Sequence, residues 1–262
     1  MKIAKPMIAG LTACLGFLLP LVRSAQAPPK ASSFKTVIFS SKDGLQVTAD
    51  LYLAHPSDAP FIVFFHQARG SRGEYRMIAP ELNAFGFNAM AVDQRIGGSF
   101  NAIKNETARR FGQEGTSEAY LDALPDMEAA VKYARKNYAK GKLIIWGSSY
   151  SASLALKIAG DYPDLVDGVL AFSPGEYFAP SGKGLTFIRD SARKIAVPVF
   201  IASSSSEKND WYSIYEAIPG VRKANFLPAS DGAHGSSALF EYYDASKDYW
   251  KAVKDFLRPF LR

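Results

Sequence analysis

The sequence predicts a single α/β domain built on a doubly wound, mostly parallel β-sheet with an antiparallel hairpin at its amino-terminal end. From Pro60 onward, short apolar runs rich in β-branched residues alternate with stretches of helical periodicity. Right-handed crossovers would join such strands in parallel. Before Pro60, apolar and polar residues alternate on both sides of Lys42-Asp43-Gly44, which is typical of a hairpin. The 262 residues, 48% of them hydrophobic, suffice for one large core.

Residues 1–27 have the pattern of a secretory signal peptide. Lys2 and Lys5 precede an apolar run of 16 residues, and small residues at 24–27 offer a cleavage site. The apolar run is too short for a comfortable membrane span. We therefore expect an exported protein, either secreted or periplasmic, whose mature chain has no membrane span.

The processing of this segment has alternatives. Pro28 follows the expected cut after Ala27 and would hinder signal peptidase, so the cut could lie nearby or the segment could persist as an anchor. Leu11-Thr12-Ala13-Cys14 also resembles a lipoprotein box, which would make Cys14 a lipidated amino terminus, but the apolar residues that follow it are in the wrong order for such a signal. Residues 28–34 are expected to form a linker and residues 35–262 the domain.

The composition excludes several classes of function. The net charge of +6 falls to +3 without Lys2, Lys5 and Arg23, and no block of Lys and Arg exceeds what a solvated surface carries. We therefore expect no nucleic-acid interface. Cys14 is the only cysteine, so a chain cleaved after Ala27 has neither a disulfide nor a cysteine nucleophile.

The first half of the domain contains the hairpin and the first parallel strands. The hairpin strands are predicted at 36–40 and 45–53, and the continuous apolar run 61–65 predicts a strand covered on both faces. Helical spacing over 74–85 predicts a helix, and 87–92 the next strand.

The next stretch supplies a long connection and a strong helix. Residues 94–115 are polar and contain glycine, and such long loops are candidate pocket walls, although a plain surface insertion is an equal alternative. Apolar residues recur at helical spacing over 120–134, which requires Pro125 to lie in the first turn. A strand at 143–146 and a helix that ends at Asp161 follow.

The last third completes the alternation. Strands are predicted at 166–172, 197–202 and 224–227, with a short helix at 211–217. The connection between the first two of these strands, residues 175–196, is too short for a substantial lid domain. The final helix carries one apolar face formed by Trp250, Val253, Leu257 and Phe260.

A tight turn joins the strand at 143–146 to the helix that follows it. Gly147-Ser148-Ser149-Tyr150-Ser151 is one residue away from the G-x-S-x-G nucleophile elbow, in which a strained turn exposes the serine hydroxyl above a parallel sheet. Small residues on either side of the apex avoid collisions with the neighbouring backbone. Ser149 is therefore the candidate nucleophile.

A serine nucleophile needs a base, and the chain offers three histidines. His55 lies in a turn at the end of the hairpin and is expected to be surface filler. His66 ends a strand, but it precedes the serine and so breaks the order nucleophile, acid, histidine of elbow-type enzymes. His234 lies in a flexible loop between the last strand and the last helix, where the base of such a fold belongs.

The acid that orients the histidine should follow the penultimate strand. Glu207 and Asp210 both lie there, and Glu207 is favoured because it is nearer the strand end. Asp93 is a remoter third candidate, since it precedes the serine. Two backbone N–H groups should stabilise the developing oxyanion: that of Tyr150, after the nucleophile, and that of Gln67, in the loop after the strand at 61–65.

Four motifs in order resemble the signatures of α/β-hydrolases of the dienelactone hydrolase-like and carboxylesterase kind. They are Phe64-Phe65-His66-Gln67-Ala68-Arg69-Gly70-Ser71-Arg72-Gly73-Glu74-Tyr75, Ala91-Val92-Asp93-Gln94-Arg95-Ile96-Gly97-Gly98, Trp146-Gly147-Ser148-Ser149-Tyr150-Ser151 and Gly232-Ala233-His234-Gly235. The resemblance implies hydrolysis of an ester, less often of an amide, without a metal or organic cofactor. This chain departs from it in three places: Ser149 replaces the cysteine of dienelactone hydrolases proper, and Ser151 and Gln67 replace glycines that are common in the family.

We therefore predict an exported serine hydrolase with an α/β-hydrolase fold and little or no lid. It would cleave small-molecule esters with short or medium acyl groups through an acyl-enzyme on Ser149. Tyr150, Phe178 and the 94–115 connection are candidate walls of a shallow site, although aromatic residues at such positions are as often part of the core. Two alternatives remain: a peptidase or amidase of the prolyl-oligopeptidase kind, and a catalytically silent binding module on the same fold.

Overall fold

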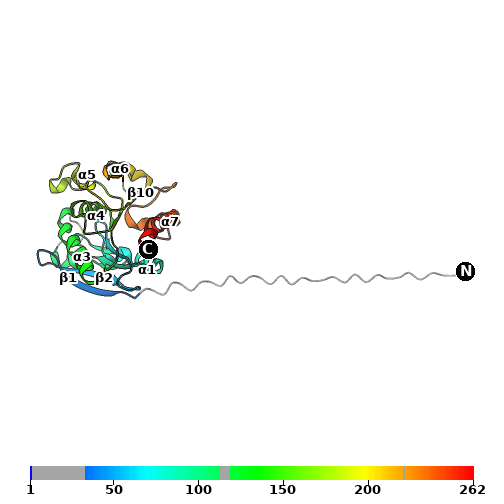
Figure 1. The fold of residues 1–262 in the computed structure, drawn as a ribbon, viewed down its shortest axis with the longest axis horizontal. Coiled ribbons are helices and arrows are strands. Elements are labelled where there is room, and N and C mark those ends of the chain that lie inside the picture. Colours follow the sequence, from blue (N-terminus) through cyan, green and yellow to red (C-terminus); the bar gives the residue numbers. More distant parts are fainter. Residues whose placement is uncertain (2–32, 113–118, 221) are drawn as a thin grey trace. The chain divides into compact units, whose positions relative to one another are not determined.

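The structure is a computed structural model that describes residue 1 and residues 33–112, 119–220 and 222–262 (Figure 1). Apart from residue 1, the predicted signal peptide at 1–27 lies outside these residues, as do the lipoprotein box at Cys14 and most of the linker at 28–34. Within the described part of the chain, no helix is long and apolar enough to cross a membrane.

An eight-stranded sheet forms the centre of the domain, with the order β1-β2-β4-β3-β7-β8-β9-β10. β1 pairs with β2, and β2 with β4, in antiparallel fashion, whereas every other pair is parallel. The predicted fold class is confirmed, including the amino-terminal hairpin. The strands are β1 (Lys35–Ser40), β2 (Gln46–Tyr52), β3 (Phe61–Phe65), β4 (Asn88–Val92), β7 (Leu143–Ser148), β8 (Gly168–Phe172), β9 (Val199–Ala202) and β10 (Lys223–Phe226).

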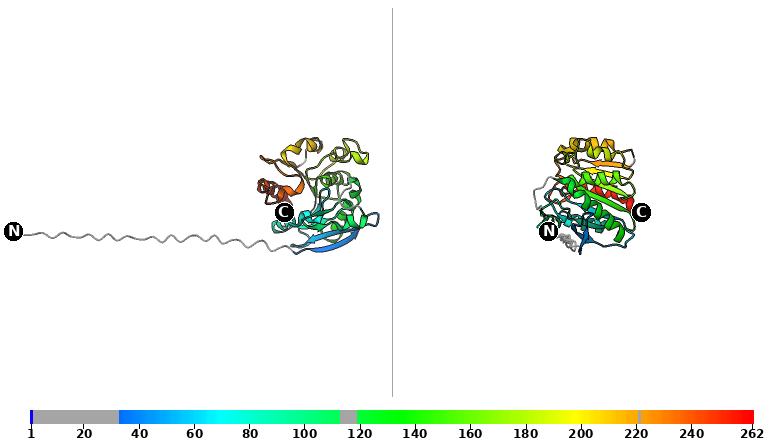
Figure 2. Two further views of the ribbon diagram at one scale, coloured as in Figure 1. Left: turned by 180° about the vertical axis from the view of Figure 1, so that it is seen from behind. Right: turned by 90° about the vertical axis from the view of Figure 1, so that its left-hand side faces the viewer.

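Helices cover both faces of this sheet (Figures 1 and 2). Buried residues of α3, α4, α5 and α6 share one apolar cluster, and those of α1 and α7 share the other. Their bounds are α1 (Ile78–Phe85), α2 (Glu106–Phe111), α3 (Leu124–Asn137), α4 (Tyr150–Asp161), α5 (Phe187–Ala192), α6 (Lys208–Ala217) and α7 (Ser246–Leu257).

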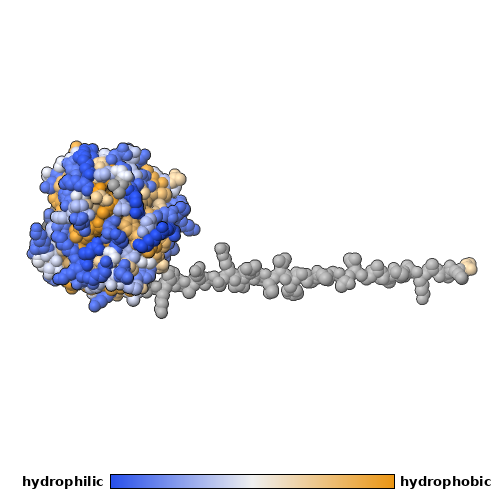
Figure 3. Space-filling view, viewed as in Figure 1, coloured by the Kyte–Doolittle hydropathy of each residue, from blue (hydrophilic) through white to orange (hydrophobic). Residues whose placement is uncertain are grey.

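The central strands divide their side chains between these two clusters. In β7, Leu143 and Ile145 join the cluster under α3 to α6, and Ile144 and Trp146 join the cluster under α1 and α7. This is the period of two that a strand imposes on its side chains. Because both sides are buried, the strand is apolar throughout, as the sequence indicates. Hydrophilic residues predominate on the outer face seen in Figure 3, with apolar residues in patches between them.

The first helix begins later than its periodicity predicts. Residues Arg72–Arg76 form a 3₁₀ turn, and α1 starts only at Ile78. Pro80 lacks an N–H and fits only in the first helical turn, so the α-helix cannot extend far upstream of it. Glu74 consequently lies in the 3₁₀ turn rather than on a helix face, and its side chain is buried.

Pro125 lies in the first turn of α3, which confirms its predicted place. At the end of the chain, α7 stops at Leu257, and Phe260 lies in a following 3₁₀ turn, Arg258–Leu261, that contains Pro259. Phe260 nevertheless packs in the cluster under α1 and α7. The predicted apolar face is therefore formed by a helix and a turn together.

The connection at 94–115 is more ordered than predicted. It contains a two-residue hairpin, β5 (Ser99–Phe100) and β6 (Ile103–Lys104), and then α2; residues 113–118 lie outside the described part. Tyr150 and Phe178 are 0% and 1% exposed and belong to the apolar cluster. These two side chains are core residues, so their predicted role as walls of an open site is wrong.

Candidate active site

The candidate site lies where several parallel strands end at the same edge of the sheet. Phe65 pairs with Gly147, Ser148 with Phe172, and Phe172 with Ala202 in the strand registers. The loops that follow β3, β7, β8 and β9 therefore leave the sheet side by side. Binding sites of open α/β sheets lie at the carboxyl ends of the strands.

Ser149 is the apex of the turn between β7 and α4. Its backbone has φ 62° and ψ −126°, a strained conformation for a residue with a Cβ atom. A Cβ atom at Gly147 would overlap the carbonyl of Ser151 and the N–H of Ala152, so only glycine fits there. The turn thus has the backbone geometry of a nucleophile elbow, and the small residue that such a turn needs before the apex is present.

Ser151 has a hydrogen-bonding role that glycine could not supply. Its buried hydroxyl lies 2.9 Å from the N–H of Ser148, which it accepts, and 2.7 Å from the carbonyl of Phe65, to which it donates. The serine thus ties the elbow to the end of β3. The departure from the G-x-S-x-G pattern leaves the elbow closed and adds a link to the neighbouring strand.

The Ser149 side chain is left available by this arrangement. Its N–H donates to the carbonyl of Phe172 at 2.7 Å, which extends the pairing of β7 with β8 by one residue. Its hydroxyl makes no hydrogen bond with any described residue, and Ser149 is 8% exposed. Contacts between a catalytic serine and its base are often long in structures without substrate.

His234 and Glu207 form the pair that a serine nucleophile requires. Nδ1 of His234 is hydrogen-bonded to Oε1 of Glu207, and the side chains are 45% and 20% exposed. Nε2 of His234 is thereby left free to act on a hydroxyl. The sequence predicted Glu207 over Asp210, and it is Glu207 that contacts the histidine. Asp210, in the first turn of α6, acts on His234 through its charge alone.

The electrostatics of the pair follow from this contact. The hydrogen bond that His234 donates to Glu207 raises the pKa of His234, against the effect of its partial burial. Burial alone would raise the pKa of Glu207, but the hydrogen bonds from His234 and Ser173 outweigh it and hold that pKa below its usual value. The pair is therefore a carboxylate and an imidazole that readily accepts a proton.

Ser173 is a site residue that sequence reasoning missed. It follows β8 with a φ of 53°, and its hydroxyl donates to Oε2 of Glu207 at 2.7 Å. The same hydroxyl accepts the N–H of Gly235 at 2.9 Å. One side chain thus joins the acid to the loop that carries the histidine. A signal for it was its place directly after an apolar strand, next to the elbow strand.

The histidine loop is also attached to the elbow itself. The N–H of Ser236 donates to the hydroxyl of Ser148 at 2.9 Å. Gly235 has a φ of 67°, and a Cβ atom there would overlap the same Ser148 hydroxyl. This close approach brings the residue next to His234 against the residue next to Ser149.

The backbone N–H groups of Tyr150 and Ala68, both beside the elbow, make no hydrogen bond with any described residue. Tyr150 opens α4, whose amino-terminal N–H groups have no acceptor within the helix. The N–H of Gln67, which the sequence suggested as the second oxyanion donor, instead donates to Oε2 of Glu74 at 2.9 Å. The N–H of the next residue, Ala68, has no hydrogen-bond partner among the described residues.

The remaining candidates from the sequence lie away from this constellation. His66 is buried and bonded to Gln67 and Asn105, and burial lowers its pKa to about 4. His55 contacts the carbonyl of Asn83. Asp93 accepts the N–H and the guanidinium of Arg72 at 2.7 and 2.6 Å. These three have structural roles in the loops below and beside the site.

No group of three or more His, Cys, Asp or Glu side chains that could hold a metal ion occurs among the described residues.

The comparison with family models matches residues 57–261 to the family described as serine aminopeptidase, S33. This match covers most of the chain and every residue of the site. The chain belongs to the S33 serine aminopeptidase family of α/β-hydrolases. Membership in this family confirms the prediction of a serine hydrolase.

Solved structures share the fold of this S33 family member. A Pyrococcus furiosus esterase is 17% identical, with a TM-score of 0.64 over 88% of this chain and 92% of its own. A dienelactone hydrolase from Anabaena variabilis is 15% identical, with a TM-score of 0.68 over 89% and 100%. A carboxyl esterase from Bacillus coagulans is 13% identical, with a TM-score of 0.69 over 88% and 99%. A search of the curated proteins found no match.

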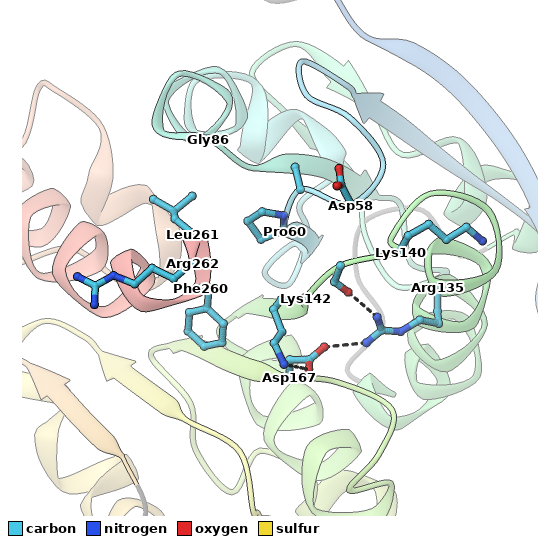
Figure 4. Close-up of a pocket in the computed structure, with 12 residues that line it drawn as sticks. Asp58, Pro60, Gly86, Arg135, Lys140, Lys142, Asp167, Phe260, Leu261 and Arg262 are labelled. Atoms are coloured by element: carbon cyan, nitrogen blue, oxygen red, sulfur yellow. Dashed lines mark hydrogen bonds and ion pairs between the residues drawn. The ribbon is translucent and has the colours of Figure 1, made fainter.

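Figure 4 shows a pocket of about 640 Å³ in this S33 hydrolase. Its lining residues lie at the amino-terminal ends of the strands, whereas Ser149 follows the carboxyl end of β7. The pocket is lined by residues that precede β3, β7 and β8, among them Pro60, Lys142 and Asp167. Arg135 and Lys142 both point at Asp167, at 2.8 and 3.1 Å. These two cations are thus engaged by a carboxylate, and the pocket is separate from the elbow.

Proposed function

We propose that the protein hydrolyses carboxylic esters through an acyl-enzyme on Ser149. The observation that supports this best is the His234–Glu207 pair, which is held against a serine elbow by the contact of Ser236 with Ser148. The backbone of Ser149 has a φ of 62° at a strand-to-helix turn, which costs conformational free energy in a residue with a Cβ atom. Such strain is concentrated at functional sites.

The reaction would proceed in two halves. Ser149 Oγ attacks the ester carbonyl carbon while Nε2 of His234 takes its proton, and Glu207 stabilises the imidazolium that forms. The N–H groups of Tyr150 and Ala68 would receive the oxyanion, in place of the Gln67 group that is bound to Glu74. His234 then protonates the leaving alkoxide, and the alcohol departs. Water, deprotonated by His234, attacks the acyl carbon. The bond to Ser149 Oγ breaks, the carboxylic acid leaves, and His234 returns the proton to Ser149.

The acyl group would be short or medium in length. The connection between β8 and β9 contains a three-residue 3₁₀ turn, Ala179–Ser181, and the six-residue α5, which is packed against α4 and α6. A segment of this size does not supply the long apolar cover that sequesters long acyl chains. No cofactor or metal enters this mechanism.

Peptide hydrolysis is the second candidate, because the family description names a serine aminopeptidase. The same triad attacks esters and amides, but an aminopeptidase must also bind the free amino group of its substrate. A catalytically silent module would keep the fold and the binding surface without turnover.

A panel of substrates distinguishes ester hydrolysis from peptide hydrolysis and from the absence of turnover. The wild type should hydrolyse nitrophenyl acetate and butyrate faster than the palmitate ester and faster than aminoacyl nitroanilides. Ser149→Ala should lose at least about a thousandfold in kcat, whereas Ser57→Ala, an exposed serine at the opposite edge of the sheet, should match the wild type. Equal rates for Ser149→Ala and the wild type would refute the nucleophile.

Labelling tests turnover competence independently of the substrate. A fluorophosphonate should modify the wild type at Ser149 and leave Ser149→Ala unmodified. A folded wild-type protein that resists the reagent would favour the silent module. Preferential cleavage of nitroanilides would favour the peptidase.

We further propose that the protein is exported to the periplasm or the medium. The support is the pattern at residues 1–27, with charged, apolar and small residues in the order of a signal peptide. Fractionation of expressing cells and mass spectrometry of the mature amino terminus test this. An uncleaved chain in the cytoplasm would contradict it, and a lipid-modified Cys14 would identify the lipoprotein alternative.

A further inference from the structure

A second carboxylate, Glu74, is buried directly beneath the proposed site. It lies in the 3₁₀ turn Arg72–Arg76, and its residue is 0% exposed. A buried carboxylate is costly unless it is paired or hydrogen-bonded, and the ionised form is penalised most. Groups of this kind are concentrated at functional sites.

Two elements of the site donate hydrogen bonds to Glu74. Ser148, next to the nucleophile, donates its hydroxyl to Oε1 at 2.7 Å. Gln67, next to Ala68 in the proposed oxyanion loop, donates its N–H to Oε2 at 2.9 Å. Each oxygen therefore has its own donor from a different loop.

The histidine loop joins the same cluster through Ser148. The hydroxyl that donates to Glu74 also accepts the N–H of Ser236, two residues after His234. Gly235 lies so close to this hydroxyl that no larger residue fits. The elbow, the oxyanion loop and the histidine loop are thus connected through one carboxylate and one hydroxyl.

This arrangement suits the ionised form of Glu74. A carboxylate only accepts hydrogen bonds, which is what both its partners require. A proton on either oxygen would face a donor, so one of the two links would have to break or reverse. Burial raises the pKa of Glu74 to about 7, against the hydrogen bonds from Ser148 and Gln67.

The charge of Glu74 also acts on the proposed base. The titratable groups that face Glu74 are His234, Tyr75 and Tyr150. Those that face His234 are Glu207, Glu74 and Asp210, and each of these three carboxylates raises the pKa of the histidine. Glu207 contacts the imidazole directly, whereas Glu74 is fully buried and acts on it through its charge.

We propose that Glu74 is a positioning residue of the hydrolase: its carboxylate sets the relative places of the oxyanion loop, the elbow and the histidine loop, and its negative charge tunes His234. This inference rests on the proposed function, in which His234 is the general base. Glu74 itself contacts neither substrate nor nucleophile.

Glu74→Gln tests the inference, because it keeps the shape and removes the charge. The amide would also present an N–H₂ group to one of the two donors. We expect kcat for a short nitrophenyl ester to fall about 10- to 100-fold with little change in KM, since small displacements of catalytic groups have effects of this size. The acid limb of the kcat/KM profile should move to lower pH, because His234 loses a charge that raises its pKa. A folded variant with wild-type kcat and an unmoved limb would overturn the proposal.

A matched control separates this effect from the loss of any carboxylate. Asp167 accepts the N–H of Leu143 at 2.8 Å and pairs with Arg135, at the opposite edge of the sheet. Asp167→Asn should lower stability and leave both kcat and the acid limb unchanged. If it moved the limb as Glu74→Gln does, the effect would be general and the assignment to Glu74 would be wrong.

A measurement on His234 itself distinguishes failure of this inference from failure of the proposed function. NMR titration of the His234 ring in the full chain reads its pKa without any substrate, and Glu74→Gln should lower it. An unchanged pKa contradicts the charge coupling, even if the wild type hydrolyses esters. If the wild type fails to hydrolyse esters while the His234 pKa falls as expected, the proposed function fails but the coupling stands.

If Glu74→Gln does not fold, Ser148→Ala interrupts the same cluster from the elbow. It should lower kcat at least about tenfold, because Glu74 and Ser236 both lose a partner next to the nucleophile. Wild-type kcat in this variant would overturn the positioning role.

Discussion

Ser173 donates its hydroxyl to Glu207 at 2.7 Å, on the carboxylate oxygen that does not contact His234. The carboxylate is therefore held between a serine fixed at the end of β8 and the imidazole. Because Ser173 also accepts the N–H of Gly235 at 2.9 Å, it determines how the acid lies relative to the histidine loop. The site thus has a supporting hydroxyl outside its proposed triad.

Replacement of Ser173 by alanine should lower activity without unfolding the protein. Glu207 would lose a donor, its pKa would rise, and the imidazole would be oriented less firmly. We expect kcat to fall about tenfold, the value of one charge-assisted hydrogen bond, with KM nearly unchanged in steady-state assays. Ser153→Ala is the control: among the described residues, this buried hydroxyl donates to the carbonyl of Gly175 at 2.7 Å and accepts its N–H at 2.8 Å. Equal kcat losses in the two variants would contradict a specific role for Ser173.

Two variants test which carboxylate orients the histidine; in each of them one candidate acid is replaced by its neutral amide. Glu207→Gln should lower kcat by about three to four orders of magnitude, because the amide favours the wrong tautomer of the histidine. Asp210→Asn removes only a distant charge and should change kcat less than about fivefold, with the acid limb slightly lower in pH. Ester hydrolysis by purified variants at several pH values measures both. A larger loss in Asp210→Asn would reverse the assignment.

Gly235 should tolerate no side chain. Gly235→Ala combines a positive φ with an overlap at the Ser148 hydroxyl, so we expect a loss of about 2–4 kcal/mol in the free energy of unfolding and a strong loss of kcat. Gly182→Ala is a close control, because Gly182 has a φ of 70° but no atom within 4 Å of the added Cβ. For that control, denaturant unfolding should show a loss of only about 1 kcal/mol in the free energy of unfolding. Equal losses in both would show that the contact with Ser148 is unimportant.

The pH dependence of stability should carry a contribution from Glu74. Its pKa is raised from 4.5 to about 7, so the folded state binds a proton more tightly than the unfolded state does. This contribution is fully present below pH 4.5 and is lost as the pH rises to 7 and above. As the pH rises between these limits, the free energy of unfolding of the wild type should fall by on the order of 3 kcal/mol relative to that of Glu74→Gln, since each pKa unit corresponds to about 1.4 kcal/mol. Denaturant unfolding of both proteins at pH 5 and pH 8 measures the difference, and parallel curves would contradict the buried charge.

Much of the fold could be predicted because it depends on local periodicity. The apolar run that became β7 and the helical spacing of α3 are properties of neighbouring residues. Ser149, Glu207 and His234 could be named as candidates because each follows a strand of a parallel sheet, and the carboxyl ends of such strands meet at one edge. The start of α1 was misjudged because helical spacing continues through the 3₁₀ turn that precedes it.

The supporting residues could not be found in this way. Glu74 looks like an exposed residue near the start of a helix, and only the packing of three loops around it makes it a buried acceptor. Ser173 is one serine among many, and its partner Glu207 is 34 residues away along the chain. The N–H of Gln67 matched the expected position in sequence, but the carboxylate of Glu74 determines where that group points. Such contacts depend on tertiary structure rather than on any local pattern.

The contact of Ser236 with the elbow has a kinetic consequence. The two residues it joins, Ser148 and Ser236, are 88 positions apart, and the hydroxyl of Tyr75 lies 3.4 Å from Ser236 across 161 positions. Contacts of such long range form slowly, because the intervening chain must be ordered before they are made. During refolding, recovery of hydrolytic activity should therefore lag behind recovery of helical signal. The rate at which hydrolytic activity returns would then measure the last step of folding.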